Sequence, residues 1–340
     1  MLIPKFWAQA KAPVTVPPGV GAPGKLLKRA KKSRMVQRFG WSQSSQDAAE
    51  QHAQGRLTAA IAEAQLRGVR ARGETDGPGV AALERIAPYG LEGIPIREEI
   101  IAEHPHATLT RNRYGAICLN TPDVLFADVD LPEFAQSASG AITILLMMAL
   151  AMYFGQYLLL IPPLLALLLL AFWQRARARQ HLKHRRQSLL EAIRGVADRN
   201  SELLLRVYET PNGFRVLALH DLFDPAADAT TELLTALRCD PHYRRMCLIQ
   251  QCFRARVSAK PWRTSMSDPR APHRIAVWPL PPEKVAARQI WVQSYQRAAQ
   301  DFAACRYLET LGRGTAHPVA LGICTLHDTE SKANSALPLA

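Results

Sequence analysis

The chain has 340 residues, a formal net charge of +13, 48% hydrophobic residues and six cysteines. A chain of this length can bury a hydrophobic core of its own. It can form two domains or one larger domain with an insertion. The basic excess favours anionic partners, and the scattered cysteines, none of them in a CxxC pair, suit a reducing compartment.

Residues 1–41 are rich in Pro, Gly, Lys and Arg, and the first acidic residue of the chain is Asp47. This composition predicts a disordered basic tail. The tail has no apolar h-region, so export by a cleaved signal peptide is not expected. From Ser42 onward, an Ala-rich stretch with leucine and isoleucine at helical spacing predicts a helix.

Residues 42–140 are expected to form the first part of a folded domain. Their clearest strand signal consists of two apolar runs, 113–120 and 124–130, separated by the turn residues Thr121-Pro122-Asp123. Such a pattern predicts a strand-turn-strand unit.

Residues 141–173 contain no charged side chain and are followed by the basic sequence RARARQHLKHRR. This predicts a membrane segment from Ala141 to Trp173, since a helix crosses the hydrocarbon core in about 20 residues. The run is too long for one upright span and too short for two, and Pro162 and Pro163 interrupt it past its middle. It forms one kinked span or a hairpin that returns to the same side; a buried hairpin in a soluble domain is the third alternative.

The positive-inside rule places the basic sequence and the C-terminal region in the cytoplasm, at a bacterial inner membrane. The hairpin is the favoured alternative, because a single span would require residues 1–140 to cross the membrane without a signal peptide. With a hairpin, both polar parts of the chain face the cytoplasm and can form one domain.

Residues 174–328 are expected to complete this domain. The patterns predict helices at 179–199, 229–237, 240–251 and 283–311, a hairpin at 203–220 that turns at Asn212-Gly213, and an extended basic segment from Phe253. Residues 319–328 are strand or helix, and residues 329–340 are a disordered tail. The fold class is α+β, an antiparallel or mixed sheet with flanking helices, interrupted by the hydrophobic membrane segment.

Asp128 and Asp130 lie two residues apart near the end of an apolar strand, so both carboxylates lie on one face of the sheet. Two hard oxygen ligands on a rigid element suit Mg²⁺ or Mn²⁺, with open positions for phosphate oxygens. His220 completes the predicted metal site. Further candidates for a third ligand or a general base are Asp221, Asp224, His327 and Asp328. A strand that simply ends in exposed acids is the alternative.

Two CxxH spacings, Cys239 with His242 and Cys324 with His327, offer four zinc ligands between them. Both spacings also arise by coincidence. Cys118 and Cys324 lie in apolar runs, where a small buried thiol is the other interpretation.

Basic residues in and after the hairpin suit phosphate groups. Arg254 and Arg256 alternate and share one strand face, and Trp262 can stack a base. The predicted phosphate or nucleic-acid site consists of Arg215, Arg254, Arg256, Lys260, Trp262 and Arg263. The alternative is an ordinary basic strand sealed by an aromatic side chain.

A DxD strand followed by a hairpin with a Thr-Pro-x-Gly turn resembles the archaeo-eukaryotic primase-polymerase superfamily. The resemblance covers residues 113–220 apart from the apolar run, and it rests on Asp128, Asp130, Thr210, Pro211 and Gly213. It implies a phosphate- or nucleotide-binding cleft. Phe214-Arg215-Val216 stands where the hairpin histidine of that family would follow.

Residues 240–263 carry the sequences DPHY, FRAR and KPWR. They resemble an uncharacterised family of bacterial membrane proteins, which implies one structural unit and no particular activity.

These patterns predict a membrane-anchored protein that binds nucleotides or phosphates with a metal ion, or that transfers phosphoryl or nucleotidyl groups. The alternative is a non-enzymatic membrane scaffold whose basic segments bind anionic lipid headgroups, nucleic acid or a protein partner. No catalytic residue is assigned, and enzymatic activity is left open.

Overall fold

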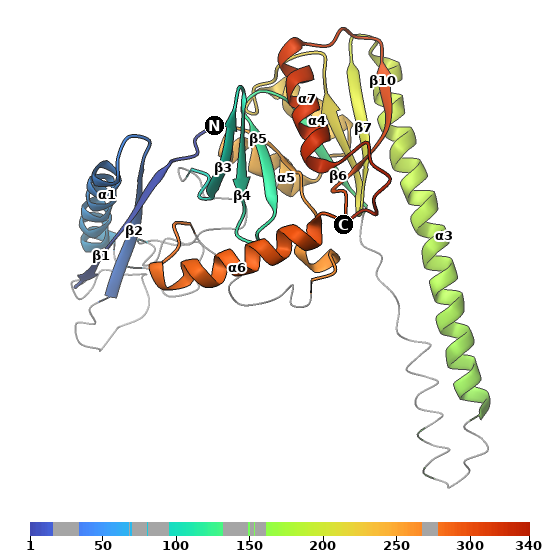
Figure 1. Cartoon of the computed structure of the whole chain (residues 1–340), viewed down its shortest axis with the longest axis horizontal. Helices are drawn as coiled ribbons and strands as arrows, with labels where there is room; N and C mark the ends of the chain where they lie inside the picture. Colours follow the sequence, from blue (N-terminus) through green and yellow to red (C-terminus); the bar gives the residue numbers. More distant parts are fainter. Residues whose placement is uncertain are drawn as a thin grey trace.

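The computed structural model of the chain describes residues 1–15, 34–67, 69, 80, 95–131, 149, 153, 161–266 and 278–340. These residues form an α+β fold with three antiparallel sheets (Figure 1). One sheet belongs to a small N-terminal unit, and the other two form the central part of the molecule.

The N-terminal unit has two layers. β1 (Phe6–Val14) pairs antiparallel with β2 (Arg34–Ser42), and α1 (Gln46–Arg67) packs against both strands. Small apolar side chains recur along the face of α1 that packs on the strands, which allows close approach. The buried residues of this face are Ala49, Ala53, Leu57, Ala60 and Ala64.

The predicted disorder of residues 1–41 is wrong for residues 1–15 and 34–41. Val14 and Val36 lie in one buried cluster with Leu57 of α1, so these strands bury apolar side chains against the helix that follows them. Residues 16–33 lie outside the described residues.

The first central sheet has the strand order β3-β4-β5-β9. Its members are β3 (Glu99–His104), β4 (Ala107–Arg111), β5 (Ile117–Thr121) and β9 (Phe253–Arg256). β9 comes from a distant part of the sequence and pairs with β5, with Cys118 opposite Arg256. The basic strand predicted from FRARV is therefore an edge strand of this sheet.

The second central sheet has the strand order β10-β7-β8-β6. Its members are β6 (Phe126–Asp130), β7 (Leu204–Thr210), β8 (Gly213–Ala218) and β10 (Arg306–Gly312). β7 and β8 form the predicted hairpin, with Thr210 opposite Gly213, and this prediction is confirmed.

The predicted strand-turn-strand unit around Thr121-Pro122-Asp123 is correct in its strands and wrong in their pairing. β5 pairs with β4 and β9, whereas β6 pairs with β8. Asp123 lies between the two strands, where its carbonyl oxygen accepts a hydrogen bond from the Phe223 amide. The connection therefore passes from one sheet to the other and does not close a hairpin.

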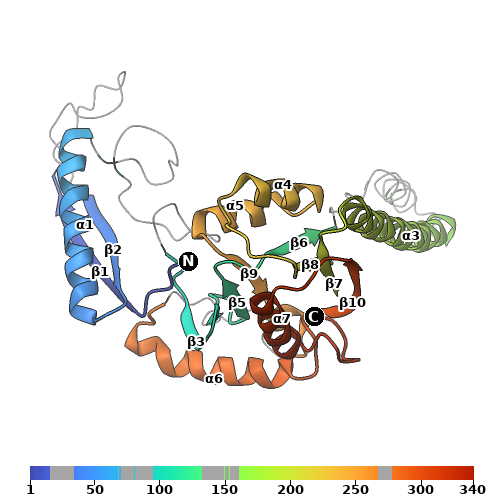
Figure 2. The ribbon, with the colours of Figure 1, turned by 90° about the horizontal axis from the view of Figure 1, so that it is seen from above.

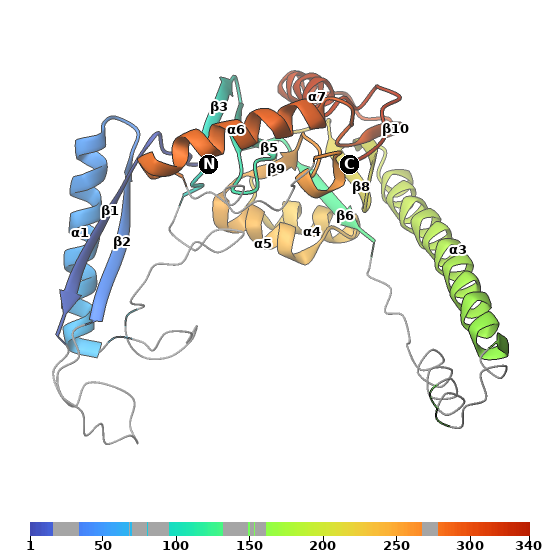
Figure 3. The same cartoon turned by 60° about the horizontal axis from the view of Figure 1, so that its bottom comes forward.

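Helices cover the two faces of the central sheets. Figures 2 and 3 show α4 (Asp228–Ala236) and α5 (Pro241–Gln250) on one side and α7 (Pro318–Ser331) on the other. α5 begins as predicted, because the Asp240 side chain accepts a hydrogen bond from the His242 amide and Pro241 occupies the first helical position. A short 3₁₀ helix, η2 (Pro261–Arg263), follows β9.

The single helix predicted for residues 283–311 is wrong. α6 (Pro282–Ala299) ends well before β10, and Arg306–Gly312 pairs with β7 as the edge strand of the sheet. Tertiary pairing here overrides a helical pattern.

The predicted disorder of residues 329–340 is also wrong. α7 continues to Ser331, and Ala333 and Ala340 are fully buried against residues 303–307.

α3 (Ile161–Arg199) is a long helix that extends away from the central sheets (Figure 1). Its uncharged part ends at Gln174, before Arg175, and is shorter than the about 20 residues that a span requires. Pro162 and Pro163 lie in the first turn of α3, where the missing N–H groups cost no helical hydrogen bond.

Within the described part of the chain, no helix is long and apolar enough to cross a membrane. This finding contradicts the predicted membrane segment that interrupts the fold, the transmembrane anchor, and the inner-membrane location with a cytoplasmic C-terminal region. Ala141 and most of the apolar run before Ile161 lie outside the described residues.

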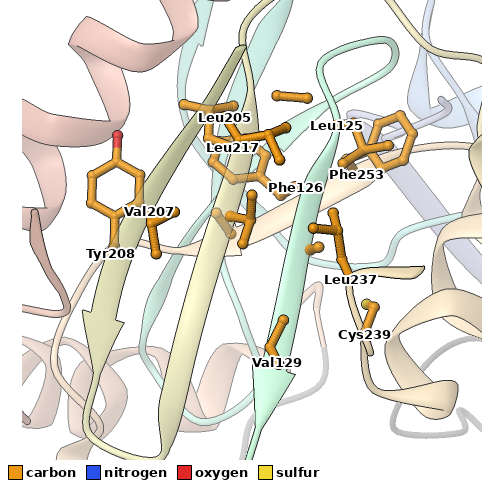
Figure 4. Close-up of a cluster of buried hydrophobic side chains, with 14 of the residues drawn as sticks. Leu125, Phe126, Val129, Leu205, Val207, Tyr208, Leu217, Leu237, Cys239 and Phe253 are labelled. Carbon is orange, nitrogen blue, oxygen red and sulfur yellow. The ribbon is translucent and has the colours of Figure 1, made fainter. Parts of the chain in front are cut away.

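The two central sheets share one apolar core. Phe126 from β6, Leu217 from β8 and Phe253 from β9 belong to a single buried cluster (Figure 4). Tyr208 lies at the border of this cluster, with its hydroxyl directed away from the apolar side chains (Figure 4). Since β6 and β9 lie close together at the junction of the sheets, charged residues from both strands meet there.

Candidate functional site

The candidate site lies at the junction of β6, β8 and β9. Asp128 stands directly opposite Arg215 in the β6–β8 ladder, and Asp130 stands opposite Gly213. The DxD strand and the 203–220 hairpin therefore belong to one sheet. Asp128 Oδ1 lies 3.7 Å from Arg215 Nε, so the two side chains form an ion pair across the strands.

Gly213 is required at this position by close packing. A Cβ atom there would lie 2.0 Å from the carbonyl oxygen of Val129, which no side chain can tolerate without a backbone shift. The glycine thus lets the hairpin turn approach the acidic end of β6.

Arg215 is almost completely buried, with 3% of its surface exposed. Its Nη1 donates a hydrogen bond of 2.9 Å to the carbonyl oxygen of Arg256 and lies 3.2 Å from His327 Nε2. Arg254 is paired with Glu98. These two members of the predicted phosphate site are therefore already engaged inside the protein.

The remaining three cations of the predicted phosphate site follow one another in and after β9. Arg256 Nη1 donates to the carbonyl oxygen of Ser258 at 2.7 Å, and Arg263 Nη1 is buried without a hydrogen-bond partner. Among the described residues, no carboxylate lies within ion-pair distance of Arg256, Lys260 or Arg263. We call these three residues the basic turn.

The cations of the basic turn repel one another. Burial lowers the pKa of the Lys260 ammonium, and Arg256 and Arg263 lower it further, against the opposing effects of Asp130 and Asp128. Burial and the neighbouring Arg215 likewise lower the pKa of Arg256. An anion bound at the basic turn would therefore be stabilised by attraction to these three cations.

Asp130 borders the same turn. Burial raises the pKa of this carboxyl above its ordinary value, and the adjacent Asp128 carboxylate raises it further. The two acids of the motif thus differ, because Asp128 has Arg215 as a cationic partner and Asp130 has none within ion-pair distance in the described residues.

Aromatic side chains lie beside the basic turn. Trp262 is 44% exposed, and Lys260 Nζ lies 5.7 Å from the centroid of its ring. Tyr114 meets Trp262 edge to face, with ring centroids 6.1 Å apart. A flat apolar surface is therefore available next to the cations.

His220 lies elsewhere in the fold. It follows the opposite end of β8, five positions beyond Arg215, which corresponds to about 16 Å along an extended strand. Its Nδ1 lies 3.3 Å from the Leu204 amide, and burial lowers its pKa. The structure does not bring His220 together with Asp128 and Asp130.

The described residues contain no group of three or more His, Cys, Asp or Glu side chains arranged to hold a metal ion. The DxD motif, the two CxxH pairs and the acids after β8 all lie in the described part of the chain and belong to no such group. The binding of Mg²⁺ or Mn²⁺ stays a prediction without a ligand set to support it.

A second polar cluster lies between the sheet and α7, on the other side of Arg215. His327 is fully buried, and its Nδ1 lies 3.2 Å from Asp328 Oδ1. Asp328 also accepts hydrogen bonds of 2.6 Å from the Tyr208 hydroxyl and from Arg206 Nη2. The Cys305 thiol lies 3.8 Å from His327 Nε2.

The sequence singles out His327 and Asp328 of this cluster as candidates for a general base. It gives no signal for Cys305, Tyr208 or Arg206, because β7, which carries Arg206 and Tyr208, and Cys305, which precedes β10, meet α7 only in the folded chain. Alternation in β7 is the one available hint, since it places Arg206 and Tyr208 on the same face.

Comparisons of the chain with models of protein families, with curated proteins and with solved structures find no match. The resemblances to the primase-polymerase superfamily and to a bacterial membrane-protein family therefore stay predictions.

Proposed function

We propose that this chain binds the phosphate and base of a nucleotide unit, free or within a single-stranded nucleic acid, at the basic turn and Trp262. The observation that carries this proposal is the convergence of Arg256, Lys260 and Arg263 without a carboxylate partner in the described residues.

An anion at the basic turn would relieve the repulsion between its cations. Binding would then raise the lowered pKa of Lys260 and give the buried Nη1 of Arg263 an acceptor. Charge-assisted bonds of this kind fix a phosphate group but do not select a base.

Trp262 supplies the second half of the proposed recognition. Its exposed ring lies beside Lys260, so a phosphate on the ammonium places an attached base within reach of the indole. Every base can stack on an aromatic ring. Trp262 would therefore bind nucleotides without selecting a particular base.

Asp128 and Asp130 would limit where the ligand lies. Both carboxylates act on Lys260 from the β6 side, so phosphate oxygens are repelled from that side and favoured toward Arg263. The proposal concerns binding, and it assigns no catalytic residue.

The test is fluorescence anisotropy of the full chain with a labelled oligothymidylate, repeated with inorganic phosphate and ATP as competitors. Lys260→Met and Arg263→Met should each lower the salt dependence of log K by about 1, as expected for the loss of one phosphate contact. Trp262→Leu should weaken binding about 5- to 150-fold, the range for one stacked base.

The matched controls are Lys284→Met and Arg245→Met, which remove the same charges at exposed positions of α6 and α5. Equal losses in the controls and in the basic-turn variants would attribute binding to net charge and reject the site. If phosphate competes with the oligonucleotide but Trp262→Leu does not weaken binding, the proposed stacking of a base on Trp262 is wrong.

A further inference from the structure

Cys305 and His327 lie side by side in the core beneath α7. Both side chains are fully buried, and Cys305 Sγ lies 3.8 Å from His327 Nε2. This site is separate from the basic turn, so its role does not depend on the proposed nucleotide binding.

Asp328 orients the imidazole of His327. The carboxylate oxygen Oδ1 lies 3.2 Å from Nδ1, and hydrogen bonds from Tyr208 and Arg206 hold that carboxylate in place. Since Asp328 accepts the Nδ1 proton, Nε2 carries the lone pair, which faces both the donating Arg215 Nη1 at 3.2 Å and the Cys305 thiol. The three residues therefore have the arrangement of nucleophile, base and orienting carboxylate.

The surroundings of Cys305 favour its thiolate. Arg215 Nη1 lies 3.2 Å from the same Nε2, which places a buried cation next to the pair. Burial alone raises the pKa of Cys305, but the His327 hydrogen bond, the charges of His327 and Arg215, and Ser331 outweigh it and lower the pKa. Burial raises the pKa of Cys239, Cys247 and Cys252, and none of these thiols has a histidine among the groups that act on it.

Ser331 also faces the Cys305 thiol. Its side chain is 1% exposed, and a hydrogen bond between its hydroxyl and the thiol is one of the causes that lower the pKa of Cys305. An oxygen atom bonded to Cys305 would take the place of the sulfur as the partner of this hydroxyl.

Residues 332–340, which we call the cover, close over Cys305. The Tyr307 amide donates to the carbonyl oxygen of Ala333 at 2.9 Å, and the Ala303 amide donates to that of Pro338 at 3.0 Å. A polar pocket of about 570 Å³ lies between α7 and this cover, lined by Arg206, Cys324, Asp328, Lys332 and Asn334. The pocket and the Cys305 site share Asp328, which lines the pocket and contacts His327.

We propose that Cys305 is a nucleophilic cysteine, activated by His327 and oriented through Asp328, that reacts with a small hydroperoxide admitted past the cover. A small hydroperoxide suits a fully buried thiol because it occupies little space. It does not need the extended groove in which a peptide or an acyl substrate would bind. The Ser331 hydroxyl is placed to hydrogen-bond the oxygen that Cys305 gains.

The reaction requires only the groups of this site and the hydroperoxide. The thiol proton passes to His327 Nε2 and replaces the hydrogen bond from Arg215 Nη1, which keeps its bond to the Arg256 carbonyl oxygen. The thiolate sulfur then attacks one peroxide oxygen. The S–O bond forms as the O–O bond breaks, and the departing oxygen takes the proton from Nε2 to give water or an alcohol. Cys305 is oxidised by two electrons to the sulfenic acid, and the hydroperoxide is reduced.

The test is a brief exposure of the full chain to hydrogen peroxide, followed by dimedone labelling and mass spectrometry of each cysteine peptide. Cys305 should be labelled about tenfold faster than Cys247 and Cys252, which are equally buried but have no histidine neighbour. His327→Gln should remove this difference. Equal labelling of the three cysteines in the wild-type chain would overturn the proposal.

Two further measurements do not depend on the folding of His327→Gln. The rate of iodoacetamide alkylation of wild-type Cys305 should rise with pH to a midpoint below about 8.5, the ordinary value for a thiol. Arg306→Met removes the bond from Arg306 Nη2 to the Leu337 carbonyl in the cover and should speed labelling of Cys305. A midpoint above the ordinary value, or no effect of Arg306→Met, would contradict the activated thiol or the cover respectively.

Discussion

Asp128 on β6 places its Oδ1 3.7 Å from Nε of Arg215 on β8, so that a carboxylate at the surface neutralises a guanidinium in the core. The side chain of Asp128 is 38% exposed, whereas that of Arg215 is 4% exposed. Asp130 lies on the same face of the same strand but has no such partner in the described residues, and its pKa is raised by burial and by Asp128.

The two acids should therefore respond in opposite ways to the same substitution. Asp128→Asn leaves Arg215 as a buried cation without a carboxylate and should destabilise the protein by about 1–2 kcal/mol, less than the 3–5 kcal/mol of a fully buried pair. Asp130→Asn should be neutral or slightly stabilising at about pH 7, because the uncharged form is the one its surroundings favour. Urea unfolding of both variants checks this, and loss of stability in Asp130→Asn would contradict it.

The stabilisation from Asp130→Asn should also depend on pH with a defined sign. A folded carboxyl with a raised pKa binds more protons than the unfolded one, so wild-type stability falls as pH rises from about 3.8 through the folded pKa. The variant lacks this fall. The difference in unfolding free energy should thus vanish below about pH 3.8 and be fully present near neutral pH. A difference that is constant over this range would show that ionisation is not its cause.

Asp328 should behave in the opposite sense. Burial raises the pKa of its carboxyl, but the His327 and Tyr208 hydrogen bonds and the Arg206 charge outweigh burial and lower the pKa. Its stabilising contribution is therefore present above about pH 3.8 and is lost as pH falls through the folded pKa. Asp328→Asn should cost about 3–5 kcal/mol at neutral pH, because Arg206 loses its carboxylate. The cost should shrink on acidification, as measured by denaturant unfolding along a pH series.

The hairpin turn offers a matched pair of glycine substitutions. Gly213→Ala forces a Cβ against the Val129 carbonyl and should destabilise by about 1–3 kcal/mol, the usual cost of overpacking. Gly322 lies in α7 with no atom within 4 Å of an added Cβ, so Gly322→Ala should stabilise by up to about 1 kcal/mol. Thermal unfolding compares the two, and similar melting temperatures would contradict the close approach of the turn to β6.

The sequence predicts local elements well where the signal is local. The turn at Asn212-Gly213 and the Asp240 cap lie within a few residues of the structures they determine, and both are found as expected. Prediction from local sequence fails for β10. Arg306–Gly312 continues a helical pattern and becomes a strand only by pairing with β7.

The same limit applies to the candidate sites. The basic turn is contiguous in sequence and was visible as FRAR and KPWR, but the engagement of Arg215 and Arg254 depends on partners that lie far away along the chain. Cys305 meets His327 through the packing of α7 on the sheet, which no spacing in the sequence encodes. The membrane prediction rested on the composition of the apolar run, whereas no helix in the part of the chain that the structure describes is long and apolar enough to cross a membrane.

Tyr208 tests whether the polar cluster beneath α7 stabilises the fold through its hydroxyl group. This hydroxyl is buried, donates to Asp328 Oδ1 at 2.6 Å and accepts from Arg206 Nε at 2.9 Å. Tyr208→Phe should therefore cost about 1.5–3 kcal/mol, as for a hydrogen bond to a charged group. The hydroxyl of Tyr307 on the neighbouring strand lies 3.1 Å from the exposed Thr310 hydroxyl, so Tyr307→Phe should change stability by less than about 0.5 kcal/mol. Both variants keep the aromatic ring, so equal unfolding free energies would contradict a stabilising role for the Tyr208 hydroxyl.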